Sequence, residues 1–337
     1  MTVLDWLRDS DPAIRWQVLR DLDGATTGVV TAERSRVATE GWGARLLALR
    51  GADGQWAGGA YFPAAAVGTD VPAAGCQPWT ATTYSLLQLR DFGVDPKNDQ
   101  IRRTVELVRE NCRWEEGAQP YFTGEVEPCI NGMAVGLGAY FGEDVDGVVA
   151  RLLGDQLNDG GWNCWAADGA VVSSVATTIN VLEGLLAHEQ ATGGSAETSE
   201  ARRRGEEYLL DRRLFRRKST GETADPAWLK FSFPTRWHYD VLRALDYFRS
   251  TGNPPDPRLA DATELLGSKR QPDGTWLLEN THPGQVHFQL EDGDGRPSRW
   301  NTLRALRVLK WCGDGVPAQA RLPVSFSDDP MLPRSTW

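Results

Sequence analysis

Cysteine and histidine are scarce in this chain of 337 residues, with five cysteines and four histidines. The cysteines stand singly, without a Cys-x-x-Cys pair, as Cys76, Cys112, Cys129, Cys164 and Cys312. An odd number of widely spaced cysteines does not indicate a disulfide framework. We therefore predict a fold held together by its hydrophobic core, for which the 41% apolar content is ample.

The sequence also lacks an excess of basic charge and a long apolar run. It carries 36 Lys and Arg against 46 Asp and Glu, a net charge of −10, which argues against nucleic acid or an anionic membrane as a partner. No run approaches the ~18 apolar residues of a membrane span. Residues 1–6 show no basic segment followed by an apolar one. We expect a cytoplasmic protein without an integral membrane segment.

What the sequence does contain is tryptophan, with 14 residues, and one recurring turn. Residues 152–189 read as the end of a helix, a turn at Asp159-Gly160-Gly161, then Trp162, a loop and a second helix with an apolar body. Glycine supplies the positive φ angle that a sharp turn needs. Ser173 or Ser174 can cap the second helix. The segment therefore predicts a helical hairpin.

This hairpin recurs along the chain. Five marker tryptophans, Trp56, Trp114, Trp162, Trp228 and Trp276, stand 58, 48, 66 and 48 residues apart, which is one helix pair plus loops and is typical of a repeat architecture. The predicted pairs of first and second helices are 33–50 with 79–87, 96–112 with 129–141, 145–157 with 173–190, 200–217 with a helix from 237, and 257–270 with 298–312. Residues 193–199 read as a flexible polar linker.

The predicted fold class is all-α, a single (α/α)5–6 toroid of helical hairpins with an inner and an outer ring of helices. Short turns make the partners antiparallel, so the amino-terminal turns of the inner helices meet at one mouth. The predicted division places N-terminal helices in 1–30, as a cap or a first hairpin. The toroid follows in 31–313, and 314–337 form an extended C-terminal tail.

The turn motif carries a resemblance to known proteins. A leucine-rich helix ending in Gln or Arg and then Asp-Gly-x-Trp stands at 156–162 and 270–276. It resembles the QW repeat of squalene-hopene and oxidosqualene cyclases, whose toroid is also found in the β subunits of protein prenyltransferases. The repeat pattern covers roughly residues 40–312. The resemblance implies an apolar, aromatic-lined pocket for an isoprenoid.

The chain departs from the chemistry motifs of these families. It has no Asp-x-Asp-Asp run, which in the cyclases crowds one carboxylic acid with others and fixes its proton by hydrogen bonds. Its acidic cluster at 291–294 reads as a solvated turn. Prenyltransferase β subunits bind zinc through an Asp-x-Cys pair and a later histidine. Here Glu127-Pro128-Cys129 resembles the pair, and Ala176-Thr177 stands where the histidine is expected.

The start of one predicted inner helix, Trp237-His238-Tyr239-Asp240, offers acid/base chemistry of its own. A carboxylate and an imidazole in an apolar cavity are readily tuned toward working pH. We predict Asp240 as the catalytic acid and His238 as its orienting partner. The alternative is that His238 only caps its helix.

Eight further residues are candidate substrate-binding groups: Trp79, Cys129, Asn131, Trp165, Thr177, Trp237, Trp300 and Asn301. The tryptophans either line a cavity or wedge helices apart, and the asparagines either orient a ligand or cap helices. Cys76, Cys129 and Cys164 with His238 could ligate zinc, although buried cysteine also serves for packing. No metal or cofactor is assigned.

Three hypotheses for function follow. The first is a terpenoid-cyclase-like toroid that binds an apolar, isoprenoid-type molecule and promotes acid/base-assisted cyclisation or isomerisation, with tryptophan faces stabilising cationic charge. The second is a carbohydrate-active toroid that uses Glu279, Glu291 or Asp240 as carboxylates. The third is a non-catalytic lipid-binding or scaffold toroid. The sequence does not decide whether the chain forms a homo-oligomer.

Overall fold

The computed structural model describes residues 2–68 and 77–313, and the protein is mostly helical, as predicted. The predicted tail at 314–337 and Cys76 lie outside the described residues. The α-helices are α1 Val3–Arg8, α2 Pro12–Asp21, α3 Thr27–Ser35, α4 Gly41–Ala48, α5 Thr82–Phe92, α6 Asp99–Asn111, α7 Pro128–Phe141, α8 Asp146–Gly154, α9 Val175–Thr192, α10 Ala196–Leu210, α11 Val241–Ser250, α12 Ala260–Ser268 and α13 Arg299–Cys312. In the part of the chain that is described, strand pairing is limited to a two-stranded antiparallel ribbon of β1 Trp276–Leu277 and β2 Pro297–Ser298.

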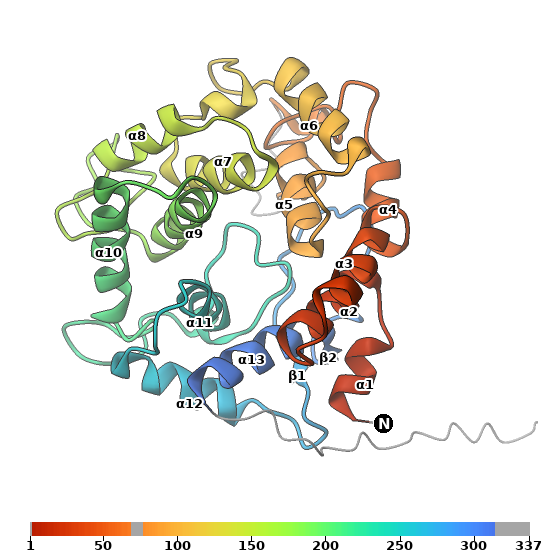
Figure 1. The fold of residues 1–337 in the computed structure, drawn as a ribbon. Coiled ribbons are helices and arrows are strands. Elements are labelled where there is room, and N and C mark those ends of the chain that lie inside the picture. The colour runs from red at the N-terminus through yellow and green to blue at the C-terminus, as the bar shows by residue number, and fades with distance from the viewer. Residues whose placement is uncertain (1, 69–76, 314–337) are drawn as a thin grey trace, which may run out of the picture.

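Figure 1 shows how the helices alternate in space. Helices α4, α6, α8, α10 and α12 lie at the periphery, and the helices that follow them, α5, α7, α9, α11 and α13, lie nearer the centre. Each peripheral helix buries fewer than half of its residues, whereas each central helix buries most of its own. The connection from α10 to α11, drawn in teal, extends toward the centre of the molecule.

The tryptophan of the recurring turn has one structural role in three of the hairpins. Trp56, Trp162 and Trp276 are fully buried, and each indole N–H donates to a backbone carbonyl ten residues earlier, at 2.8, 2.7 and 2.8 Å. That carbonyl lies in the last turn of the peripheral helix, where carbonyl groups lack helical partners. Each tryptophan therefore caps the helix that precedes it.

The same three tryptophans are tied to the helix that follows. Their backbone N–H groups donate to the hydroxyls of Thr82, Thr178 and Thr302, at 3.2, 3.1 and 2.9 Å. These threonines lie in the first turn of α5, α9 and α13. One indole with its own backbone thus connects the end of a peripheral helix to the start of a central helix. This is why the hairpin recurs with the same geometry.

Glycine is required at the turn itself. Gly160 has a φ of +98°, and a Cβ added there would lie 2.6 Å from the carbonyl oxygen of Arg204 in α10. The central helices α7 and α9 also approach closely through glycine, because a Cβ on Gly184 would lie 2.3 Å from the carbonyl oxygen of Gly132. Any larger side chain at these positions would push two helices apart.

The other two marker tryptophans behave differently from the predicted pattern. The indole of Trp114 donates to the carbonyl of Tyr121, seven residues later, at 2.9 Å. Trp228 is half-buried in a short 3-10 turn, Pro226–Leu229, and packs edge-on against Tyr239. There the Tyr239 hydroxyl donates instead, to the carbonyl of Leu214 at 2.7 Å. The fourth hairpin therefore uses a tyrosine where the others use tryptophan.

Helix boundaries differ from the sequence prediction in three places. The predicted helix 33–50 is wrong, because α3 ends at Ser35. A new helix, α4, begins at Gly41, which has a φ of +62°. The backbone N–H of Trp42, the second residue of α4, donates to the carboxylate of Asp11. The predicted linker 193–199 is also wrong. Ser195 and Thr198 form a capping box that starts α10 at once. This helix ends at Leu210 rather than 217.

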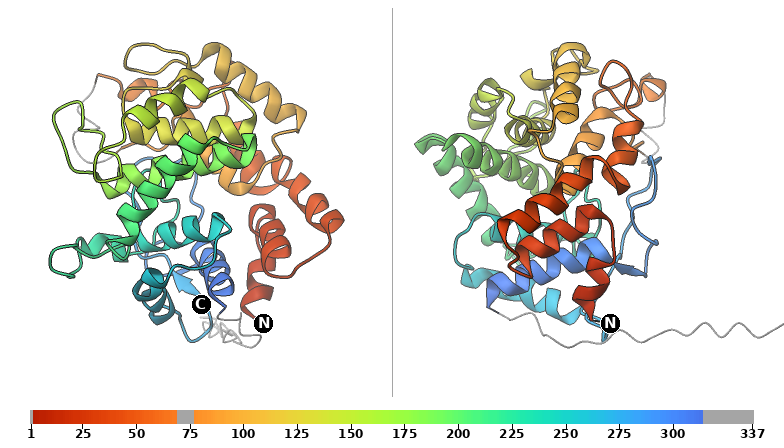
Figure 2. Two further views of the ribbon diagram at one scale, coloured as in Figure 1. Left: turned by 60° about the vertical axis from the view of Figure 1, so that its left-hand side comes forward. Right: turned by 45° about the vertical axis from the view of Figure 1, so that its right-hand side comes forward.

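The N-terminal region packs between the first and the last of the central helices. Helices α1 and α2 are separated by residues 9–11, and Pro12 is the first residue of α2. The indole of Trp16 donates to the carbonyl of Phe92 at the end of α5, at 2.8 Å, and Arg307 of α13 donates to Gln17 at 2.6 Å. Figure 2 shows the red N-terminal helices lying alongside the blue α13. Helix α2 therefore links α5 with α13.

Candidate functional site

A cavity of about 560 Å³ lies between the central helices. Helices α2, α3, α5, α7, α9, α11 and α13 all contribute to its wall, together with residues 233–236 of the α10–α11 connection. Its apolar side chains include Trp16, Leu87, Met133, Leu186, Phe233 and Trp300. A volume of this size is typical of sites for small molecules.

The wall also carries an excess of positive charge that the sequence analysis did not foresee. Eight arginines line the cavity against three carboxylates, namely Arg20, Arg34, Arg90, Arg236, Arg243, Arg249, Arg304 and Arg307 against Asp91, Glu183 and Asp246. Arg304 and Arg307 stand three residues apart on α13, so they share one face of that helix. The wall therefore differs from the purely apolar, aromatic one that the resemblance implied.

The three carboxylates of the wall are each held by an arginine. Glu183 and Arg243 form a two-pronged ion pair at 2.8 and 2.7 Å. Burial opposes the ionisation of Glu183, but the charge of Arg243 and its hydrogen bonds outweigh burial and hold the pKa of Glu183 below its ordinary value. Asp246 pairs with Arg249 at 2.7 Å, and Asp91 with Arg90 at 2.9 Å. The arginine charges outweigh burial at Asp246 as well and hold its pKa below its ordinary value, so Glu183 and Asp246 are ionised near neutral pH.

Arg236 is the exception among the arginines of the wall. Six of the eight form ion pairs, and Arg34 donates to the carbonyls of Gly93 and Val94. Within residues 2–68 and 77–313, the side chain of Arg236 has no hydrogen bond and no ion pair, although only 8% of the residue is exposed. Its guanidinium lies 5.3 Å from the ring of Trp79. Burial lowers the pKa of Arg236 to about 10.

The backbone at Arg236 is unusual as well. Its φ is +57°, a left-handed value that costs a non-glycine residue about 1 kcal/mol or more. The residue lines both the central cavity and an adjoining one of about 40 Å³. A buried cation that makes no side-chain hydrogen bond or ion pair among the described residues, on a strained backbone, is expensive for the fold. Sequence reasoning missed Arg236, because it precedes its helix by five residues in an irregular loop.

The predicted catalytic pair is not formed. Asp240 is 1% exposed, and its carboxylate accepts from the backbone N–H groups of Ser232, at 3.0 Å, and Arg243, at 2.7 Å. It is the N-cap of α11 and does not line the cavity. Burial raises the pKa of Asp240. Both oxygens are thus committed to holding the loop against the helix, and a proton donor placed there would face no ligand.

His238 belongs to a stack of rings instead. Its imidazole lies between Trp237, at 3.7 Å, and His282, at 3.8 Å, measured between ring centroids. Burial and the charges of Arg243 and Arg236 lower the pKa of His238 to about 4. Burial and the neighbouring His238 lower the pKa of His282 to about 3. Both imidazoles are therefore neutral near neutral pH.

The four predicted wall tryptophans separate into different environments. Trp300 lines the central cavity, stacked on Phe233 with centroids 4.3 Å apart. Trp79 and Trp237 lie with His238 in the stack of rings, where Trp79 meets His238 edge-on at 6.0 Å. Trp165 is 70% exposed on the loop between α8 and α9. That loop leads away from the core, so this side chain contributes no wall.

The two predicted asparagines have structural roles. Asn131 exchanges two hydrogen bonds with the backbone of Glu125, at 2.7 and 2.8 Å. Asn301 donates to the carbonyls of Phe231 and Leu277, at 3.3 and 3.1 Å. Their amides are used in fastening loops to helix starts, which is the second of the two roles expected for them.

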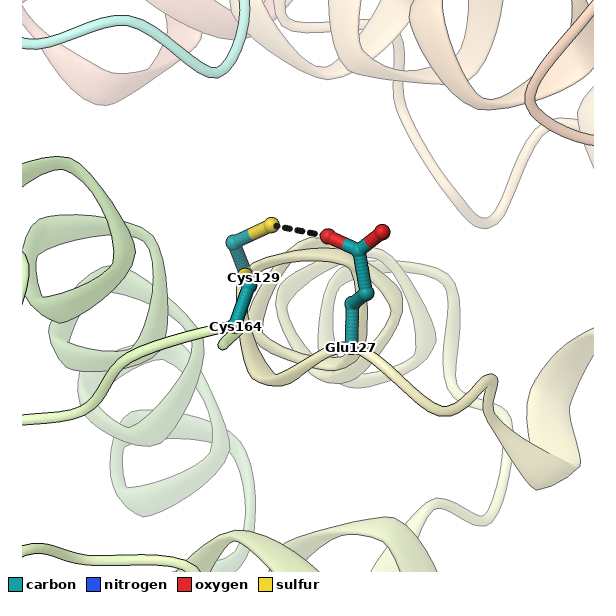
Figure 3. Close-up of side chains that lie close together, drawn as sticks. All are labelled: Glu127, Cys129 and Cys164. Carbon is teal, nitrogen blue, oxygen red and sulfur yellow. Dashed lines mark hydrogen bonds between the residues drawn. The ribbon is translucent and has the colours of Figure 1, made fainter. Parts of the chain in front are cut away.

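A second cluster of chemical interest contains two thiols. Potential ligand atoms of Glu127, Cys129 and Cys164 all lie within 4.8 Å of one another. Figure 3 shows Glu127 and Cys129 projecting together from the start of α7, with Cys164 joining them from the loop that follows α8. The Cys164 thiol is 3.4 Å from the hydroxyl of Thr177. Of the predicted zinc group, the structure thus joins Cys129 and Cys164, whereas His238 lies elsewhere.

Neither the models of protein families nor the curated proteins give a match to this sequence. Among the described residues, no helix has both the length and the apolar content to cross a bilayer. The function must therefore be argued from the site itself.

Proposed function

We propose that this chain is a single α/α toroid of the terpenoid cyclase and prenyltransferase type that binds a small amphiphilic anion in its central cavity. The alternation of peripheral and central helices supports the fold (Figure 1), as does the repeated tryptophan cap. The ligand would place an anionic head on the arginines and an apolar body on the remaining wall.

Arg236 is the observation that carries the proposal. A buried cation costs several kcal/mol unless an opposite charge accompanies it. The carboxylates of the wall are already paired with other arginines, so a ligand anion is the natural partner of Arg236. The planar guanidinium also suits two-pronged recognition of phosphate or carboxylate oxygens. The site is complete only when such an anion is bound.

The family resemblance suggests the body of the ligand. Side chains such as Leu87, Met133 and Trp300 share the cavity with the arginines, and an isoprenoid chain would bury its surface against them at roughly 25 cal/mol per Å². A prenyl phosphate or diphosphate combines both features. We take this class as the proposed ligand.

Acid-initiated cyclisation receives less support from the geometry. It needs a protonated carboxylic acid that faces the ligand, whereas the wall carboxylates are ion-paired and Asp240 caps α11. Glycoside hydrolysis would need two carboxylates of different protonation that face one ligand. Of the three candidates, Glu279 is ion-paired with Lys269, Asp240 caps α11, and Glu291 accepts from the backbone N–H groups of Arg299 and Trp300. Binding of the amphiphile is therefore the function that we propose.

Binding of farnesyl diphosphate, farnesol and inorganic diphosphate, measured by calorimetry, tests the proposal. We expect the order of affinity to be farnesyl diphosphate first, with each fragment weaker. Arg236→Met should weaken farnesyl diphosphate by about 10 to 100-fold, the value of one charged hydrogen-bonding group. Arg203→Met, which removes an exposed arginine paired with Glu200 on α10, should change nothing. Equal binding of farnesyl diphosphate by Arg236→Met and the unchanged protein would refute the proposal.

A further inference from the structure

We propose that Glu127, Cys129 and Cys164 bind one divalent cation of the zinc type. This site is separate from the anion site of the central cavity, and it does not depend on that proposal. Its ligands come from the start of α7 and from the loop between α8 and α9. The loop supplies Cys164, a ligand that the resemblance to prenyltransferases does not provide.

The donor set fits zinc by its chemistry. Two thiol sulfurs and one carboxylate oxygen are the donors that Zn²⁺ prefers among protein side chains, and three protein ligands leave a fourth position for water or another group. In a tetrahedral site with bonds of 2.0–2.3 Å, ligand atoms lie about 3.3–3.8 Å apart. The possible ligand atoms of the three residues already lie within 4.8 Å of one another. Side-chain rotations that move these atoms by about an ångström would complete the site.

The surroundings leave these donors available. In the described residues, the Glu127 carboxylate has no ion pair and accepts only from the Cys129 thiol, with 3.5 Å between sulfur and oxygen. Cys129 and Cys164 are half-buried and Glu127 is exposed, so a cation can enter from solvent. Cys129 lies in the first turn of α7. Its hydrogen bond with Cys164, together with burial, raises the pKa of its thiol, so a bound cation has to displace that proton.

Neighbouring groups would hold the ligands in place. The Thr177 hydroxyl lies 3.4 Å from the Cys164 sulfur and can donate to its thiolate, as outer-shell groups of zinc sites do. Thr177 is itself fixed in the first turn of α9 by the Ser174 cap. On binding, each thiol releases its proton to solvent as its sulfur bonds the cation, so that two protons leave for each cation bound.

Cobalt binding to the reduced full-length protein tests the inference. We expect Co²⁺ to bind at one equivalent per chain with a thiolate-to-cobalt charge-transfer band, and Zn²⁺ to displace it. Cys129→Ser and Cys164→Ser should each remove the band and weaken binding by more than about 100-fold. Cys312→Ser, at the end of α13, is the matched control and should bind as the unchanged protein does.

Two results would overturn the site. The first is the absence of a thiolate band at millimolar Co²⁺ in the reduced protein. The second is unchanged binding by Cys164→Ser, which would place the cation elsewhere. Mass measurement of the unreduced protein completes the test. A Cys129–Cys164 disulfide together with no cobalt band after its reduction would identify a redox pair instead, and would also overturn the inference.

Discussion

Replacement of Trp162 tests the idea that one indole organises each hairpin. Trp162→Ala removes a fully buried side chain, a change that typically costs about 3–5 kcal/mol of unfolding free energy. It also removes the partner of the Leu152 carbonyl, 2.7 Å from the indole nitrogen, and an unsatisfied buried carbonyl costs a further ~1–3 kcal/mol. These two costs overlap, so we expect a loss of at least about 4 kcal/mol.

The neighbouring Trp165 provides the control. It stands three residues away in the same turn, but it is 70% exposed, so Trp165→Ala should change the unfolding free energy by less than about 0.5 kcal/mol. Urea unfolding followed by far-ultraviolet circular dichroism measures both variants on the helical signal. Trp162→Phe keeps most of the packing and should lose mainly the hydrogen bond. Similar losses for Trp162→Ala and Trp165→Ala would refute the reasoning.

Two further predictions concern the residues first taken for catalytic ones. Asp240→Ala should lower the unfolding free energy by about 3 kcal/mol, because two buried N–H groups lose their acceptor. The control is the surface cap variant Ser195→Ala, which should lower it by about 1 kcal/mol in the same urea assay. Equal losses in the two variants would contradict the assignment of Asp240 as a buried cap. The lowered pKa values of His238 and His282, about 4 and about 3, mean that the unfolded chain binds more protons below pH 6.5. Stability should therefore fall as pH drops from 6.5 to 5, by about 1.5 kcal/mol for each imidazole. His282→Asn should flatten this dependence, and an unchanged slope in that variant would count against a neutral stack.

The sequence predicted the helical hairpins because their signals are local. The Asp-Gly-x-Trp turn fixes a glycine at positive φ and places an indole ten residues after the carbonyl that it caps. The serine before α9 was likewise visible as a cap. Where boundaries were missed, a distant group intervened. The start of α4, for example, is held by Asp11 from another helix.

The candidate site was less accessible to sequence reasoning. His238 and Asp240 are close in sequence, yet one joins a stack of rings and the other turns into its own helix start. Exposure of Trp165 could not be read from its aromatic character, since only the path of its loop determines it. Side-chain direction at an irregular helix start depends on the neighbouring elements, which no local pattern encodes.

The sequence by itself determined the repeated pairs of helices, their turns and their caps, since these depend on backbone hydrogen bonds and side chains within about ten residues of one another. Only the tertiary structure determined which arginines line the central cavity and which cysteines lie close together. The α10–α11 connection carries Arg236 to the central cavity, and the loop after α8 carries Cys164 to Glu127 and Cys129. Contacts of this kind join residues that are far apart in the chain, so they are fixed by the packing of whole helices rather than by any local preference.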